Sequence, residues 1–139
     1  MKKKDALILS HLKENSRISF TELSSKTGIP DTTIHYRLKK LLPFIEKFSV
    51  SLNYEKMGYK LYLLEIEPDR FTLDFITERN IDTVKEALTK IDGIIFLAEV
   101  DDRLIAVYKT KDKVKVEVSG GKVTKYQEIK NRIGNFVEL

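Results

Sequence analysis

Hydroxyl, aromatic and basic side chains are concentrated in one short stretch of the chain, residues 32–40. Hydroxyl and imidazole groups can donate or accept hydrogen bonds at the edges of nucleic-acid bases, whereas lysine and arginine pair with phosphates. The side chains that could contact bases are Thr32, Thr33, His35, Tyr36 and Lys39, and those suited to phosphates are Arg37 and Lys40. The chemistry available to this set is hydrogen bonding and charge pairing with a nucleic acid.

Each of these residues also has an ordinary structural interpretation. Tyr36 could pack against a neighbouring strand, and His35 could be a solvated surface histidine. The hypothesis of nucleic-acid contact therefore depends on the whole set of residues and not on any one of them. Arg17 could contact phosphate or form an ion pair with a carboxylate of the first two helices. Further phosphate contacts could come from Lys2, Lys3, Lys4 and Lys26, although the first three are also typical of a flexible tail.

Residues 18–42 have the pattern of two helices joined by a tight turn. Ser19 offers a capping hydroxyl, and Glu22 three residues later completes a capping box, so a helix is expected up to about residue 26. Gly28 can turn the chain with a positive φ at no steric cost. A preceding helix is expected over residues 5–13. The three segments together predict a helix-turn-helix, whose second helix fits the DNA major groove.

The second helix of this pair should begin at Pro30-Asp31 and end before Pro43. Ile34, Leu38 and Leu41 lie at i, i+4 and i+7, so they are expected to form the buried face. The hydroxyl, aromatic and basic residues named above then occupy the sides left to solvent.

Charge is distributed unevenly along the chain. Residues 1–60 contain 12 Lys and Arg against 6 Asp and Glu, whereas residues 61–139 contain 13 against 15. The positive charge therefore accompanies the helix-turn-helix, as phosphate contact requires.

The pattern after Pro43 predicts a change of architecture. Residues 44–52 alternate apolar and polar side chains, which predicts a short strand or strand pair that could form a wing. We place the domains at residues 1–52 and 61–139, with residues 53–60 as the linker.

The second domain is predicted to be α+β. Strands are expected over residues 61–66, 94–100 and 104–110, a short helical turn over 71–75, and an amphipathic helix over 81–91. Asp101 to Arg103 give a hairpin signal, so the sheet should be antiparallel. Val114, Val116 and Val118 alternate like a strand but two of them also fit one helical turn. Residues 123–132 are predicted to be helical and residues 136–139 to be a final edge strand.

The chain resembles the Lrp/AsnC family of transcriptional regulators, clearly over residues 5–58 and loosely over 59–139. Family members have an I-L-x-x-L core, N-x-R, E-L, a turn glycine, T-[VI]-x-x-R-[IL]-x-x-L and L-N-x-E-x-x-G. Here these are Ile8-Leu9, Leu12, Asn15, Arg17, Glu22-Leu23, Gly28, Thr33-Ile34, Arg37-Leu38, Leu41, Leu52-Asn53, Glu55 and Gly58.

The resemblance implies a (winged) helix-turn-helix followed by a ferredoxin-like αβ-sandwich of order βαββαβ, the RAM domain, which mediates dimerisation and often binds amino acids. It implies a sequence-specific regulator that binds double-stranded DNA as a homodimer or higher oligomer. Family members commonly carry a Gly and then a D-L pair at the hairpin that joins the second and third strands of this domain, where this chain has Val100 and Arg103-Leu104. The segment after Thr110 also lacks a helix of the expected length. Both departures argue against an amino-acid effector and indicate a degenerate C-terminal end, while leaving dimerisation in place.

Several other functions are disfavoured by the composition. The chain has no cysteine, which removes disulfides, thiolate metal sites and cysteine nucleophiles. No apolar run approaches the length of a membrane span, so we expect a cytoplasmic protein without a membrane partner. We expect no catalytic residue, metal or cofactor, because Asp101-Asp102 is better explained as a charged turn than as an acid/base pair.

Two alternative functions stay open from sequence alone. The first is an enzyme on the same scaffold, of the sirohaem decarboxylase type, although residues 61–139 contain no histidine to line its pocket. The second is a winged-helix protein–protein adaptor, against which the basic helix argues.

Overall fold

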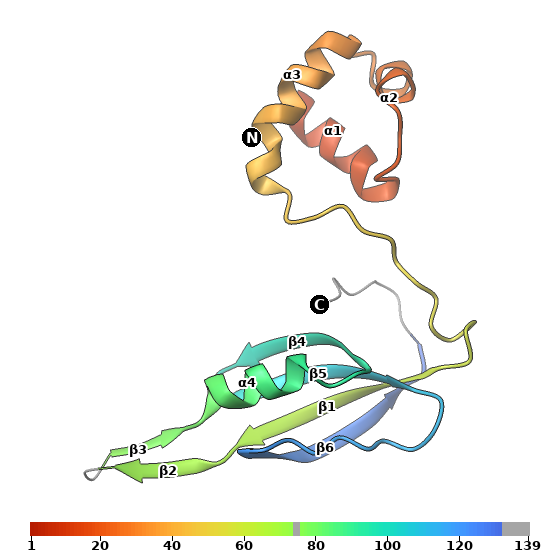
Figure 1. Cartoon of the computed structure of the whole chain (residues 1–139). Helices are drawn as coiled ribbons and strands as arrows, with labels where there is room; N and C mark the ends of the chain where they lie inside the picture. Colours follow the sequence, from red (N-terminus) through yellow and green to blue (C-terminus); the bar gives the residue numbers. More distant parts are fainter. Residues whose placement is uncertain (74–75, 132–139) are drawn as a thin grey trace. The chain divides into compact units, whose positions relative to one another are not determined.

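A computed structural model describes residues 1–73 and 76–131 of the chain (Figure 1). The chain divides into two compact units, Met1–Val50 and Ser51–Leu139. Residues 53–60, expected to be a linker, fall within the second unit. Their Tyr54 side chain is 2% exposed and packs with Leu61 and Ile95.

The first unit consists of three α-helices and one short 3-10 helix: α1 (Lys3–Glu14), α2 (Phe20–Thr27), α3 (Asp31–Leu41) and η1 (Leu42–Phe44). The three α-helices confirm the predicted ones within one or two residues. Their apolar sides meet in one core, made of Ile8, Ile18, Leu23, Ile29, Ile34 and Leu41. Burial of these aliphatic side chains is what holds such short helices in place, since helices of this length are marginal alone.

The predicted strand over residues 44–52 is wrong. Residue 44 ends η1, and residues 45–53 form no strand. Phe44, Phe48 and Val50 are 79%, 52% and 67% exposed, so the alternation of apolar residues does not bury one side. A strand needs a neighbour to satisfy its backbone, and within the described residues this segment has none.

The second unit is built on a four-stranded antiparallel sheet of order β4-β5-β1-β6. Its strands are β1 (Lys60–Pro68), β4 (Ile94–Val100), β5 (Arg103–Thr110) and β6 (Gly121–Ile129). β1 lies in the middle and pairs with both β5 and β6. This is the strand order of a ferredoxin-like sheet, so the predicted α+β architecture is confirmed.

A second, two-stranded sheet follows β1 and precedes the helix of this unit in the chain, and it projects beyond the end of β1 (Figure 1). It pairs β2 (Arg70–Leu73) with β3 (Ile76–Arg79). The predicted helical turn over residues 71–75 is therefore wrong for the described part, because residues 70–73 satisfy their backbone by pairing with β3. Residues 74–75 lie outside the described residues.

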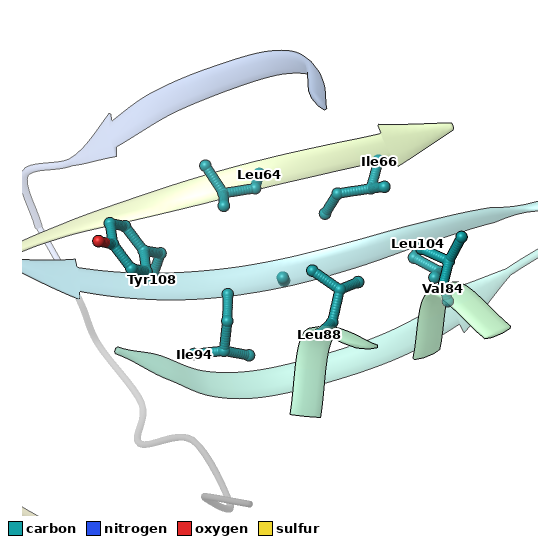
Figure 2. Close-up of a cluster of buried hydrophobic side chains, with 8 residues drawn as sticks. Leu64, Ile66, Val84, Leu88, Ile94, Leu104 and Tyr108 are labelled. Atoms are coloured by element: carbon teal, nitrogen blue, oxygen red, sulfur yellow. The ribbon is translucent and has the colours of Figure 1, made fainter. Parts of the chain in front are cut away.

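Helix α4 (Ile81–Thr89) packs against one face of the four-stranded sheet (Figure 2). Val84 and Leu88 point from the helix toward Leu64 and Ile66 of β1 and toward β5, and all four are fully buried. The helix thus occupies the predicted segment, and its apolar residues form the core as expected.

Gly93 makes the turn from α4 into β4. Its φ is +98°, and a Cβ atom there would lie 2.6 Å from a ring carbon of Tyr108 and 2.8 Å from the Lys109 carbonyl. The Gly93 carbonyl also accepts a hydrogen bond from the Lys109 amide at 2.8 Å. Glycine is required here by both its conformation and the close approach of β5.

The opposite face of the sheet carries no helix within the described residues. Leu63, Phe96 and Ile105 lie on it, which we call the open face, and Leu63 is 39% exposed. Among the described residues, Tyr54 and neighbouring Tyr59 cover one end of this face.

The segment between β5 and β6 is extended rather than helical. Residues 113–118 form neither a helix nor a paired strand, although Val114, Val116 and Val118 pack on the core under α4. The predicted helix over residues 123–132 is wrong up to residue 129, which belongs to β6. The final strand expected over residues 136–139 lies outside the described residues.

Candidate nucleic-acid interface

The turn between α2 and α3 is fixed by local hydrogen bonds. The Ser19 hydroxyl accepts from the Glu22 amide at 3.1 Å, which confirms the predicted helix cap. Gly28 ends α2 with a φ of +70°, and its amide donates to the Ser24 carbonyl at 2.8 Å. The Thr27 hydroxyl accepts from the Ile29 amide at 3.2 Å, so the turn has a defined geometry.

Helix α3 presents two different sides. Ile34 and Leu41 are 0% and 4% exposed and belong to the core, and Leu38 is half-buried between the two sides. The exposed side chains of the predicted set are Thr32, His35, Tyr36, Lys39 and Lys40, and its half-buried ones are Thr33 and Arg37. The helix therefore offers solvent a row of hydrogen-bonding and basic groups along one side.

An open hollow of about 460 Å³ lies on this exposed side. Its lining consists of Phe20, Asp31, Thr32, His35, Tyr36 and Lys39. The Phe20 and His35 rings lie with their centroids 4.7 Å apart at 48°, so α2 supports the imidazole from beneath. Phe20 is not among the residues predicted to line this site. Its position directly after the Ser19 cap, beside the start of α3, is the signal that could have indicated its contact with His35.

Tyr36 and Lys40 act as a pair one helical turn apart. The Lys40 ammonium lies 4.4 Å from the centroid of the Tyr36 ring. Hydrogen bonding from Lys40 to the phenol oxygen, added to the positive charge of Lys40, lowers the pKa of Tyr36 below its ordinary value. Both side chains are exposed, so this pair is available to a ligand.

Arg37 is held inside the protein. Its Nη1 atom lies 2.8 Å from Oδ1 of Asp5 in α1, and the two side chains are only 22% and 17% exposed. The Arg37 Nε is buried and has no hydrogen-bond partner within the described residues. Among the seven predicted residues, Arg37 thus has its charge neutralised by the protein itself.

The other predicted phosphate contacts differ in their surroundings. Lys2, Lys3 and Lys4 are exposed at the start of α1. Lys26 pairs with Glu22 at 3.3 Å, in the open. Arg17 is exposed and makes no ion pair in the part of the chain that the structure describes. This disfavours the alternative in which Arg17 pairs with a carboxylate of the first two helices.

Other kinds of site lack support in the structure. In residues 1–73 and 76–131, no group of three or more histidines and acidic residues could hold a metal ion. The Lys85 ammonium lies 2.9 Å from Glu99, one of the acidic residues near the β4–β5 hairpin. None of the described helices combines the length and apolarity needed to cross a bilayer.

Comparison with known proteins gives a consistent result. Residues 1–42 match the family described as winged helix-turn-helix DNA-binding. The chain is 33% identical over 140 residues to an uncharacterised HTH-type transcriptional regulator of Pyrococcus furiosus, covering 97% of this chain and 88% of that protein.

Two solved structures share the fold. One is a transcriptional regulatory protein of Pyrococcus furiosus described as a member of the AsnC family, with a TM-score of 0.71 and 25% identity over 95% of this chain and 91% of that one. The other is a transcriptional regulator of Neisseria meningitidis in complex with L-methionine, with a TM-score of 0.76 and 15% identity over 100% and 96%.

The helix-turn-helix with its exposed basic side, followed by a ferredoxin-like unit, defines a transcriptional regulator that binds DNA. The chain belongs to the Lrp/AsnC family of such regulators. The relatives named above are described as transcriptional regulators, which favours regulation over the decarboxylase alternative.

Proposed function

We propose that the chain controls transcription as a homodimer whose two α3 helices bind a specific duplex sequence. The observation that carries the proposal is the division of α3. Its aliphatic residues Ile34 and Leu41 are buried, while its hydroxyl, aromatic and basic residues face solvent. A helix with one such side fits the major groove, where base edges present donors and acceptors.

Roles follow from position on the helix. Residues near the N-terminus of the recognition helix contact bases in this class, so we assign base contact to Thr32, Thr33, His35 and Tyr36. Lys39 lines the hollow beside His35 and Tyr36 and completes this set. Lys40 lies farther along the helix and is assigned to phosphate.

Arg37 is assigned a different role. Its guanidinium is already paired with Asp5 and largely buried. If Arg37 turned outward to contact a phosphate, the largely buried Asp5 carboxylate would lose its partner. We propose that Arg37 is a positioning residue that holds α3 against α1, and that Lys40 carries the phosphate contact next to it.

Dimerisation is proposed to use the open face of the sheet. Leu63 is 39% exposed there beside the half-buried Phe96 and Ile105, and no described helix covers them. Packing two such faces together would remove this apolar surface from water. A two-fold dimer places two recognition helices so that the operator is a pseudo-palindrome with half-sites about one helical turn apart.

We propose that this regulator does not depend on an amino-acid effector. One structural neighbour was solved with L-methionine. In this chain the corresponding hairpin carries Arg103, whose guanidinium pairs with the Glu65 carboxylate of β1. Arg103 thus stands at the position of the Asp in the family's D-L pair, and it is held there by a carboxylate of β1.

The experiment that tests the proposal is selection of bound sites from a pool of random duplexes, using the full chain at low salt. A two-fold symmetric consensus is expected. Replacing Tyr36 with Ala should change the consensus, whereas the control Lys13→Ala, on the exposed side of α1, should leave it unchanged. Recovery of no consensus, with duplexes bound at equal affinity, would overturn sequence-specific binding.

A further inference from the structure

A cluster of lysines lies in the second unit. It lines an open hollow of about 730 Å³ whose walls are Lys60, Tyr62, Lys111, Asp112, Lys113 and Lys115. We call its four lysines the lysine patch. All four side chains are exposed.

The extended segment after β5 arranges most of this patch. Lys113 and Lys115 are exposed, while Val114 and Val116 between and beside them are half-buried against the core. In an extended chain, alternate residues lie on the same side and are about 7 Å apart. The valines therefore fix the segment on the unit, and the lysines form a line on its outer side.

The patch is positive in an otherwise acidic region. Residues 61–139, which supply three of its four lysines, hold 13 Lys and Arg against 15 Asp and Glu, yet a single carboxylate, that of Asp112, lines this hollow. None of the four makes an ion pair in the part of the chain that the structure describes. Elsewhere in the unit, Lys85 is paired with Glu99 and Arg103 with Glu65.

Aromatic rings limit the movement of the lysines at one end of the patch. The Lys111 ammonium lies 4.8 Å from the centroid of the Tyr59 ring, and the neighbouring Lys109 lies 5.1 Å from the same ring. Cation–π contact restrains a side chain that otherwise has many rotamers, so less conformational entropy is lost when a ligand binds.

We propose that the lysine patch is a second DNA-contacting surface, which binds the phosphate backbone of a duplex without regard to sequence. Two of its cations, Lys113 and Lys115, lie about 7 Å apart along the extended segment, and Lys60 and Lys111 border the same open hollow. A linear polyanion can contact such neighbouring cations in succession, and duplex DNA has charge at regular intervals along its length. This inference rests on the proposed function only in taking DNA as the ligand.

The test uses the full chain carrying Lys113→Gln and Lys115→Gln. The matched control is Arg70→Gln with Lys90→Gln, which removes the same charge from the second unit. Arg70 lies in β2 and Lys90 follows α4, and neither lines the hollow of the patch or lies on the four-stranded sheet. All four substituted side chains are exposed, so each variant should fold, as a thermal unfolding curve would verify.

The measurement is the affinity for a fluorescent duplex of arbitrary sequence, by anisotropy, over a series of salt concentrations. Each lost phosphate contact lowers the slope of log K against log salt by about 0.9. The patch variant should therefore lose up to about 2 in slope per bound chain, with affinity falling about ten- to a hundred-fold at moderate salt. The control should keep the slope of the natural chain.

The outcomes separate this inference from the proposed function. Equal slopes for the patch variant and the control would overturn the inference, while leaving binding through α3 intact. Failure of the natural chain to bind any duplex would instead overturn the proposed function. Titration with poly-glutamate distinguishes another polyanion: loss of poly-glutamate binding together with an unchanged DNA slope would reject DNA as the ligand of the patch.

Discussion

Arg37 of α3 and Asp5 of α1, separated by 32 residues in the sequence, form a largely buried ion pair with Nη1 and Oδ1 2.8 Å apart. The pair fixes the helix that carries the candidate base contacts to the first helix of the unit. Its position explains how α3 can present short side chains such as Thr32 at a defined orientation.

Removing one partner of this pair should destabilise the first unit. Asp5→Asn leaves the Arg37 charge buried beside a neutral amide, so we expect the free energy of unfolding to fall by about 1–3 kcal/mol. Urea unfolding followed by circular dichroism measures this change. The control is Glu22→Gln, which breaks the exposed pair with Lys26 and should change stability by less than about 0.5 kcal/mol. Equal effects of the two substitutions would reject a structural role for the Arg37–Asp5 pair.

Substitutions on the exposed side of α3 should divide into two classes. Lys40→Gln should weaken binding to every duplex by a similar factor and lower the salt slope by about 1, because it removes a phosphate contact. Thr32→Ala or Tyr36→Ala should change the ratio of affinities between sequences and leave the slope unchanged. Anisotropy titrations against the selected site and a scrambled site measure both quantities. A uniform loss for Tyr36→Ala would contradict its assignment to a base.

The Tyr36–Lys40 pair predicts that the affinity for DNA depends on pH in the alkaline range. Lys40 lowers the pKa of the Tyr36 phenol, so Tyr36 becomes a phenolate at a lower pH than an ordinary tyrosine. A phenolate beside DNA is repelled by phosphate, so affinity should fall as pH rises through this lowered pKa. Tyr36→Phe should move the loss of affinity to higher pH, whereas the control Tyr126→Phe, on exposed β6, should not. Identical pH profiles for all three proteins would exclude the effect.

The open face predicts the effect of a charge on assembly. Leu63→Glu should convert the proposed dimer to a monomer, because a carboxylate would have to be buried without a partner. Leu7→Glu is the matched control, since Leu7 has the same 39% exposure but belongs to α1. Sedimentation equilibrium gives the mass of each variant. A natural chain that sediments as a monomer, or a Leu63→Glu dimer, would reject this interface.

Amino acids at millimolar concentration should leave the thermal unfolding midpoint unchanged. A ligand that binds only the folded chain raises that midpoint, so a thermal-shift screen of the twenty amino acids detects an effector directly. Any reproducible increase, for methionine or another residue, would show that the Arg103–Glu65 pair does not prevent sensing.

The sequence predicted those elements whose signals are local. The Ser19 cap, the Gly28 turn and the i, i+4, i+7 spacing on α3 each depend on residues within one or two helical turns. The structure confirms the cap, the turn and the burial of Ile34 and Leu41, whereas Leu38 is only half-buried. The α4 helix and the β4–β5 hairpin were found for the same reason.

The errors fall where distant partners decide the structure. Val123, Tyr126 and Ile129 have helical spacing, yet residues 121–129 form a strand because β1 offers them backbone partners such as Leu64, opposite Tyr126. Residues 44–52 alternate like a strand but lack such a partner within the described residues. The Arg37–Asp5 pair could not be inferred either, because it joins two separate helices.

The central position of β1 also has a consequence for synthesis on the ribosome. Helices α1 to α3 find all of their core partners between Lys3 and Leu41, so the first unit can fold as soon as it emerges. Leu61 of β1 must wait for Ile129, its partner on β6, and at 5–20 residues per second that interval is roughly 3–14 s. During that time one edge of the nascent strand is unpaired and apolar. Chaperone dependence during translation should therefore concentrate in the second unit, while the DNA-contacting unit is already folded.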